Sequence, residues 1–351
     1  MSNTLFMDVQ DLVKHFKVAN SPDVVHAVDG VSFPIYRNQT LAVVGESGSG
    51  KTTLGRLLIR LTEPTAGSIL LAGNDIVRVP DKQMKPFRRR TQMIFQDPYS
   101  SLDPRMTVEQ TLSEALTIHG LAKGRQKERI AELLSVVGLD PSLSKRYPHQ
   151  FSGGQRQRIG IARALSVEPE MIVGDEPVSA LDVSVRAQVL NLLAAIRRDL
   201  GLTFVMITHD LSVVRHSADR ILVLYLGKIV EIGPADRIFK RPRHPYTRAL
   251  IGATPDPFRP RKAATEILRG EVPSPIAPPP GCRFHTRCPM VQQVCTTIEP
   301  LLESRGAGHL SACHFADQVP PTATAEAAPV LAYQRRLDII RKAYAAPGQG
   351  G

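Results

Sequence analysis

The sequence predicts an α/β fold, in which short buried strands alternate with amphipathic helices. Leu41–Val44 is an apolar run of strand length that leads through a Gly-rich turn into an apolar-striped helix over Thr52–Leu61. Met171–Gly174 and Thr203–Ile207 are two further buried runs, and a segment with helical spacing separates them. This alternation is typical of a sheet flanked by helices.

The turn after the first of these strands has the spacing G-x-x-x-x-G-K-T. Glycines let backbone N–H groups converge on phosphate oxygens, and the helix that follows points its positive dipole end at the anion. Lys51 is expected to bridge the β- and γ-phosphates, and the Thr52 hydroxyl to bind Mg²⁺. The predicted nucleotide-binding residues of this loop are Gly45, Glu46, Ser47, Gly48, Ser49, Gly50, Lys51, Thr52 and Thr53. The alternative, an ordinary strand-to-helix turn, has little weight because strand and helix are both in register.

Composition narrows the class of protein. The chain has 351 residues, and its hydrophobic fraction of 42% is that of a globular protein. We find no apolar run of membrane-spanning length and no basic-then-apolar start, so we expect a soluble cytoplasmic protein. The net charge of +11 is compatible with nucleic acid or with an anionic membrane surface, and does not discriminate between them.

The segments on either side of the loop add two candidates. Residues 5–40 are predicted to form short strands, and Phe16 among them either stacks on a nucleotide base or fills the core of an edge strand. A strand at residues 93–96 ends in the polar Gln96.

Phe151–Gln155 predicts a second anion site. Ser152 followed by Gln155 three residues later is a capping box, which marks the start of a helix. Gly153 and Gly154 would expose backbone N–H groups at the positive end of that helix.

Polar residues follow both later strands. Asp175 and Glu176 end the first, where Asp175 suits Mg²⁺ and Glu176 suits activation of a water nucleophile. Asp182 is expected to cap a helix that runs to residue 200. His209 follows the second strand, at the edge where open α/β sheets place ligands.

Together these stretches resemble the nucleotide-binding domain of ATP-binding cassette (ABC) transporters. The resemblance covers about residues 5–240 and includes six motifs in the family's order. They are the phosphate loop Gly45–Thr52, the Q-loop Gln96, the signature Phe151–Gln155, the Walker B strand Met171–Glu176, the D-loop Ser179–Asp182 and the switch residue His209.

The resemblance implies an ATPase with a RecA-like P-loop core and an inserted helical subdomain at about residues 97–165. Glu176, His209 and Gln96 would be its catalytic residues, Thr52, Gln96 and Asp175 would hold Mg²⁺, and Phe16 would stack on adenine. Two such domains would close head to tail around ATP. Ser152, Gly153, Gly154 and Gln155, with Asp182, would then contact nucleotide at the dimer interface.

Two later segments resemble the C-terminal extension of peptide and nickel importer ATPases, namely 243–250 and 278–284. The resemblance implies peptide import, with import of nickel or another small solute as the alternative and a DNA-associated ATPase as a weaker one. The implied partners are a paralogous ATPase, two membrane permeases and, indirectly, an external solute-binding protein, with no nucleic acid. The implied location is the cytoplasmic face of the inner membrane.

All four cysteines, Cys282, Cys288, Cys295 and Cys313, lie in this late region. Such a cluster favours a metal over disulfides in a cytoplasmic chain. No close C-x₂₋₄-C pair of a structural zinc site is present, so we expect a [4Fe–4S] cluster. Zinc, with help from His285, His309 or His314, is the alternative, and free thiols are the third reading.

We expect three parts: an ABC domain at residues 1–238, an extension at 239–316 and a tail at 317–351. Residues 239–281 are Pro-rich and predict an extended surface arm. Residues 316–328 are Ala/Pro-rich and predict disorder, and the apolar spacing at 330–344 predicts a short basic amphipathic helix.

Overall fold

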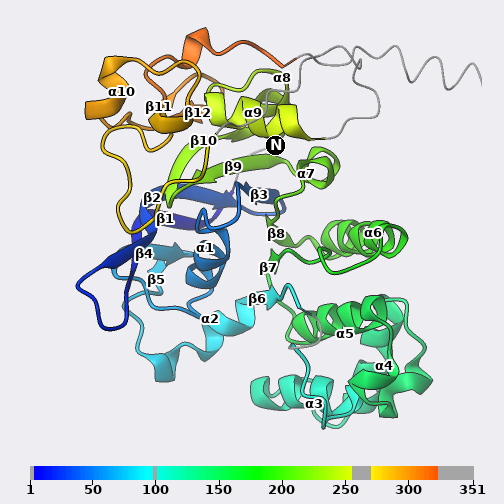
Figure 1. Ribbon diagram of the computed structural model, residues 1–351. Coiled ribbons are helices and arrows are strands. Elements are labelled where there is room, and N and C mark those ends of the chain that lie inside the picture. The colour runs from blue at the N-terminus through cyan, green and yellow to red at the C-terminus, as the bar shows by residue number, and fades with distance from the viewer. Residues whose placement is uncertain (1–3, 98–100, 255–269, 323–351) are drawn as a thin grey trace, which may run out of the picture.

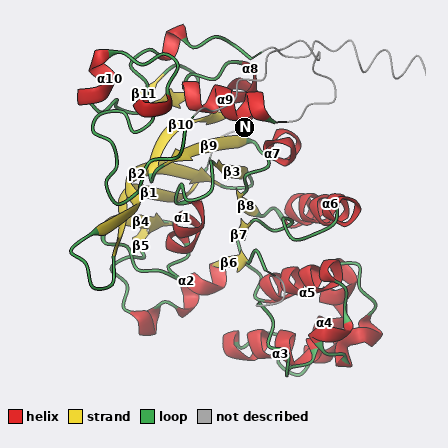
Figure 2. Cartoon of the chain, viewed as in Figure 1, coloured by secondary structure: helices red, strands yellow, loops and turns green. Residues whose placement is uncertain are grey.

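The computed structural model describes residues 4–97, 101–254 and 270–322. Its core is a large mixed sheet with helices on both faces (Figures 1 and 2). A smaller antiparallel sheet lies to one side of this sheet, and a group of helices extends from the other side. The α/β prediction is confirmed.

The large sheet has eight strands in the order β11-β12-β10-β9-β3-β8-β7-β6. The pairs β9/β3, β3/β8, β8/β7 and β7/β6 are parallel, and β10 pairs antiparallel with β9 and β12. Its strands are β3 (Thr40–Val44), β6 (Thr91–Ile94), β7 (Met171–Asp175), β8 (Thr203–Ile207), β9 (Arg220–Tyr225), β10 (Lys228–Pro234), β11 (Glu303–Ser304) and β12 (Leu310–Ser311). The central strands β3, β7 and β8 are buried at every residue, as in sheets covered on both faces.

The smaller sheet has the order β2-β1-β4-β5. Its strands are β1 (Leu5–Lys17), β2 (Val24–Tyr36), β4 (Ala66–Leu71) and β5 (Asn74–Asp75). The prediction of strands before the phosphate loop is confirmed, although two long strands form in place of several short ones. Bulges in the β1/β2 pairing absorb the shifts in register, so that each long strand stays continuous where its apolar alternation is interrupted.

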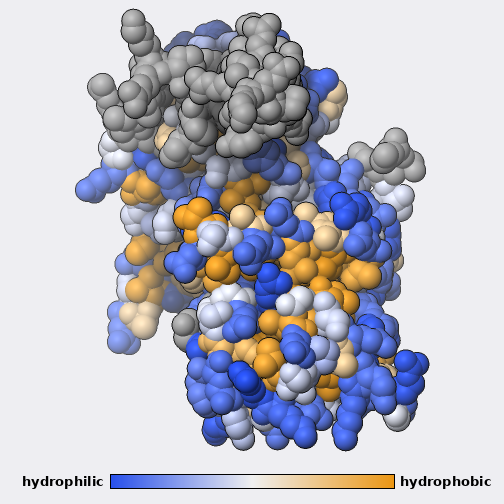
Figure 3. Space-filling model, turned by 90° about the vertical axis from the view of Figure 1, so that its right-hand side faces the viewer, coloured by the Kyte–Doolittle hydropathy of each residue, from blue (hydrophilic) through white to orange (hydrophobic). Residues whose placement is uncertain are grey.

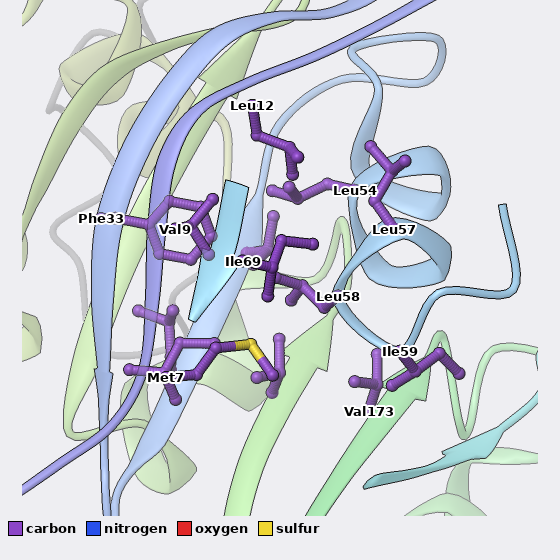
Figure 4. Close-up of a cluster of buried hydrophobic side chains, with 14 of the residues drawn as sticks. Met7, Val9, Leu12, Phe33, Leu54, Leu57, Leu58, Ile59, Ile69 and Val173 are labelled. Atoms are coloured by element: carbon purple, nitrogen blue, oxygen red, sulfur yellow. The ribbon is translucent and has the colours of Figure 1, made fainter. Parts of the chain in front are cut away.

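One hydrophobic core fills the space between the two sheets. Helix α1 (Lys51–Leu58) packs Leu54, Leu57 and Leu58 there, each fully buried. Figure 4 shows these side chains between the antiparallel strands, which contribute Met7, Val9, Leu12, Phe33 and Ile69, and Val173 of β7. This packing fixes the helix that begins in the phosphate loop.

A second core lies on the opposite face of the large sheet. It joins α3 (Val108–His119), α4 (Gln126–Val136) and α5 (Gly153–Ser166) to α6 (Val183–Leu200). Gly201, with φ 61°, ends α6 where the sequence predicts the end of the helix. Figure 3 shows the side of the molecule on which these helices lie, and apolar residues gather across the middle of that side.

The C-terminal region forms a third core against β9 and β10. Helices α7 (Leu211–Ser217), α8 (Ala235–Lys240) and α9 (Pro245–Ala253) pack there with Phe284. The remaining helices are α2 (Lys85–Arg90) and α10 (Gln293–Thr297).

Two predictions for this region need correction. The expected extended arm is wrong for 245–253, because α9 buries Tyr246 completely and Pro245 begins a helix there. The expected disorder is wrong for 316–322, where Ala316 and Val319 are buried. The helix predicted at 330–344 lies outside the described residues.

Candidate functional site

Four neighbouring strands of the large sheet end at one edge. The phosphate loop follows β3, His209 follows β8, Asp175 and Glu176 end β7, and Gln96 follows β6. Because the strands are parallel, their carboxyl ends meet, and the polar residues that follow them lie together.

The phosphate loop is tightly constrained by the backbone around it. At Gly50, with φ 102°, an added Cβ would lie 2.0 Å from the Ala27 carbonyl oxygen. At Gly45 it would lie 2.2 Å from the Leu224 carbonyl oxygen. Only glycine fits these close approaches, so the spacing of the motif reflects steric need.

The Lys51 ammonium group is held by backbone carbonyl groups of the phosphate loop. Lys51 Nζ donates to the Gly45 oxygen at 2.9 Å and to the Glu46 oxygen at 2.8 Å. Burial lowers the pKa of Lys51, against the opposing effect of nearby Glu176, Asp175 and Glu46. The buried Ser49 hydroxyl oxygen has no hydrogen-bond partner among the described residues. A lysine and an unsatisfied hydroxyl beside exposed N–H groups fit a phosphate anion.

Thr52 and Asp175 meet although 123 residues separate them. The Thr52 hydroxyl donates to Asp175 Oδ1 at 3.0 Å. Burial raises the pKa of Asp175, and the hydrogen bond from Thr52 opposes that rise. A hydroxyl and a nearly buried carboxylate suit Mg²⁺, which prefers few protein oxygens and several waters or phosphates.

Glu176 lies between the two other predicted catalytic residues. Its Oε2 accepts from Gln96 Nε2 at 3.0 Å, and its Oε1 lies 2.8 Å from His209 Nδ1. The backbone φ of Glu176 is 45°, which is strained for a residue other than glycine. Strain of this kind is held by surrounding contacts and is common at active sites, and Glu176 lines the same pocket as the phosphate loop.

One open pocket joins these groups. It is lined by Ser47, Gly48, Gly50, Lys51, Thr52, Thr53, Gln96, Glu176 and His209, and by the apolar residues Phe16, Val25, Ala27 and Pro275. Phe16 is 41% exposed, so it is not the core residue of the alternative interpretation. Val25, Ala27 and Pro275 were not predicted, because small apolar residues carry no motif.

The signature residues do not line this pocket. Ser152 caps α5 by accepting from the Gln155 backbone N–H, and the Gln155 side chain accepts from the Ser152 N–H, as the capping box predicts. Asp182 is the N-cap residue of α6, at the predicted position, although its side chain makes no cap hydrogen bond. Gln157 Nε2 donates to the Pro177 oxygen at 2.7 Å, which ties α5 to the segment after Glu176.

The four cysteines line a second, small cavity, together with His285, His314 and apolar residues. All four are free thiols, and burial raises the pKa of Cys282, Cys288 and Cys313 to about 11. His309 instead contacts Glu231, with its Nε2 2.6 Å from Glu231 Oε1.

The thiols line the same cavity but are not grouped as a set of metal ligands. No three of these sulfur atoms lie within 4.8 Å of one another in the described part of the chain. The cavity therefore brings the four cysteines together without a cluster-like arrangement of their sulfur atoms.

Comparison with known proteins agrees with this geometry. A family model described as "ABC transporter" matches residues 28–179, and one described as "Oligopeptide/dipeptide transporter, C-terminal region" matches residues 230–295. The dipeptide transport ATP-binding protein DppF of Escherichia coli is 50% identical over 313 residues, 88% of this chain and 93% of that protein.

Solved structures give the same result. The dimeric cassette MJ0796, in a post-hydrolysis state with ADP and phosphate, matches with a TM-score of 0.57 and 27% identity, over 65% of this chain and 98% of that one. The cbiO1 protein of Clostridium perfringens matches with a TM-score of 0.59 and 26% identity, over 67% and 91%. This chain belongs to the ABC transporter ATPase family, in the group that carries the oligopeptide/dipeptide transporter C-terminal region.

Proposed function

We propose that this chain is the ATP-hydrolysing subunit of a peptide importer. The observation that carries the proposal is the Glu176 carboxylate, held between Gln96 and His209 beside the phosphate loop. The chain-wide identity to a dipeptide transport ATP-binding protein supports the solute class. Nickel or another small solute is the second candidate, because the C-terminal segments also resemble those of nickel importer ATPases.

The proposal gives each side chain a role that is compatible with its contacts. The Glu176 carboxylate accepts a proton from the attacking water, and His209 and Gln96 hold that carboxylate in place. Lys51 offsets the charge on the terminal phosphates. Thr52 and Asp175, with Gln96, would hold Mg²⁺, which supplies further charge stabilisation when bound. Phe16 stacks on adenine in the pocket.

The signature residues act on the nucleotide of a second cassette. Ser152, Gly153, Gly154 and Gln155, with Asp182, lie outside their own chain's pocket, and the N-terminus of a helix attracts anions. A related cassette has been solved as a dimer. We infer head-to-tail pairing with a paralogous ATPase, which places ATP between the two.

The chain would work at the inner face of the membrane. Among the helices that the structure describes, none is both long and apolar enough to cross a bilayer. The path for the solute would therefore come from two permease subunits, supplied by an external binding protein. Nucleic acid is not among the proposed partners.

We propose a [4Fe–4S] cluster on Cys282, Cys288, Cys295 and Cys313. The four thiols line one cavity, which supports a shared metal centre. In a tetrahedral zinc site with bonds of about 2.3 Å, the sulfur atoms lie about 3.8 Å apart. Among the described residues no three of the sulfur atoms lie within 4.8 Å of one another, so the proposal rests on the shared cavity and on the sequence spacing of the cysteines; zinc is the alternative.

The proposed division of the chain follows the same reasoning. It consists of a cassette at 1–238 with a helical subdomain at about 97–165, a cysteine-bearing extension at 239–316, and a tail at 317–351. The packing of α3, α4 and α5 against one another in the second core supports the subdomain.

The assembled transporter in liposomes tests the function. ATP hydrolysis should rise when binding protein and a dipeptide are added together, and should not rise with nickel ions in place of the dipeptide. Stimulation by nickel alone would favour the second candidate. If neither the dipeptide nor nickel stimulates hydrolysis, both proposed solutes are wrong. The ATPase assignment would still stand, because it is tested separately by ATP turnover.

A further inference from the structure

The C-terminal region reaches into the phosphate loop. Arg287 lies in a short turn, His285–Arg287, and its side chain is only 4% exposed. Its Nη1 donates to Glu46 Oε2 at 2.6 Å and its Nη2 to Glu46 Oε1 at 3.0 Å. Glu46 is the residue after Gly45, at the start of the loop. A two-pronged pair of this kind fixes direction as well as charge.

The Arg287 guanidinium stays charged in this position. Its hydrogen bonds to Glu46 raise its pKa, and burial only partly opposes that rise. The partner carboxylate is 24% exposed, so water screens the pair only in part.

A second residue holds the backbone of Glu46. The Tyr246 hydroxyl, from buried α9, accepts a hydrogen bond from the Glu46 N–H at 2.8 Å. Tyr225 and Phe284 pack against Tyr246, with ring centroids 4.7 and 5.4 Å away. Aromatic packing thus makes a rigid support for Glu46 on the side away from the pocket.

Glu46 in turn affects the lysine that faces phosphate. Its carbonyl oxygen accepts from Lys51 Nζ at 2.8 Å. Its carboxylate is close enough to act on the pKa of Lys51. An uncompensated carboxylate here would repel a triphosphate, and the Arg287 cation offsets that charge.

The same region also contacts the pocket itself. The Pro275 carbonyl accepts from the His26 N–H at 2.9 Å, and Pro275 lines the pocket beside Phe16. Two segments of the C-terminal region therefore contact the nucleotide site: one bonds Glu46 of the phosphate loop, and the other lines the pocket at Pro275.

We propose that Arg287 is a positioning residue of the ATP site. It neutralises Glu46 and holds the start of the phosphate loop, so that Lys51 keeps its place. The C-terminal region is then a component of the nucleotide site, in addition to any metal that it binds. The inference rests on ATP binding and is independent of the solute.

Nucleotide affinity of the full chain tests the inference. Arg287→Gln should weaken ATP binding about tenfold and leave adenosine binding unchanged, because only the phosphates meet the exposed carboxylate. Adding Glu46→Gln should restore ATP affinity to within about threefold of the original, since the repelling charge is gone. Glu299→Gln is the matched control, because Glu299 pairs with Lys228 between cassette and extension, away from the loop.

Stability measurements separate positioning from folding. Thermal unfolding of each variant without nucleotide shows whether it folds. If Arg287→Gln does not fold, Arg287→Lys carries the test: it keeps the charge, loses the two-pronged geometry and should weaken ATP binding by less than tenfold. Unchanged ATP affinity in a folded variant would overturn the inference. Equal loss for ATP and adenosine, or no restoration by Glu46→Gln, would do the same.

Discussion

Gly154, outside the phosphate loop, is a position where the structure makes a specific steric prediction. A Cβ added there would lie 2.4 Å from Val185 Cγ1, where α5 packs on α6. Carbon atoms in contact are about 3.5–4.0 Å apart, so Gly154→Ala creates an overlap of more than about 1 Å. Overpacking of this kind costs about 1–3 kcal/mol, and the helix propensity of alanine returns at most about 1 kcal/mol. We expect a net loss of about 1–2 kcal/mol in the free energy of unfolding.

The neighbouring glycine is the control. At Gly153 the nearest atom to an added Cβ is Leu181 Cδ2 at 3.7 Å, an ordinary contact. Gly153→Ala should therefore be neutral or slightly stabilising in urea unfolding of the full chain. Val185→Ala should relieve the overlap, so the Gly154→Ala/Val185→Ala pair should lose less than the sum of the single changes. Equal stability of the two glycine variants would refute the packing argument.

Three further predictions concern other parts of the chain. Ser152→Arg should leave ATP binding by the isolated chain intact but block ATP-driven dimer formation, measured by light scattering; loss of ATP binding would contradict the dimer model. Burial alone would raise the pKa of Asp29, but hydrogen bonds from His15 and Arg283 lower it to about 2. The stabilisation that this carboxylate gives the fold is therefore present above pH 3.8 and is lost as the pH falls toward 2. Asp29→Asn should accordingly cost about 2 kcal/mol at pH 7 and flatten the acid limb of the unfolding curve, whereas an unchanged limb would count against this ion pair. Anaerobically purified protein should be brown with about four irons per chain, and Cys282→Ser should lose most of that iron; one zinc in the unaltered protein would reject the cluster.

Local motifs could be predicted because local chemistry determines them. The phosphate loop turns through positive φ at Gly45, Gly48 and Gly50, a local demand for glycine, so its spacing is visible without the fold. The Ser152–Gln155 cap is likewise complete within four residues. The order of the motifs along the chain then predicted which residues belong to the site, including Glu176 and His209, which meet at the edge of the sheet.

Contacts between distant segments could not be predicted. Arg287 and Glu46 are 241 residues apart, and no sequence pattern links the two positions. The 245–253 segment reads as part of a Pro-rich arm, yet tertiary burial of Tyr246 makes it helical. Pro275 has no distinguishing chemistry, and only the fold brings it to the nucleotide pocket.

The most direct test of the account is ATP turnover by Glu176→Gln. The amide keeps the shape of the side chain but cannot accept the proton of the attacking water. In the assembled transporter, with the corresponding residue of the partner ATPase also changed, hydrolysis should fall by at least about 10²-fold while ATP binding persists. Changing both subunits prevents the second site from masking the loss. Near-normal turnover in that double variant would contradict the assignment of Glu176 as the base.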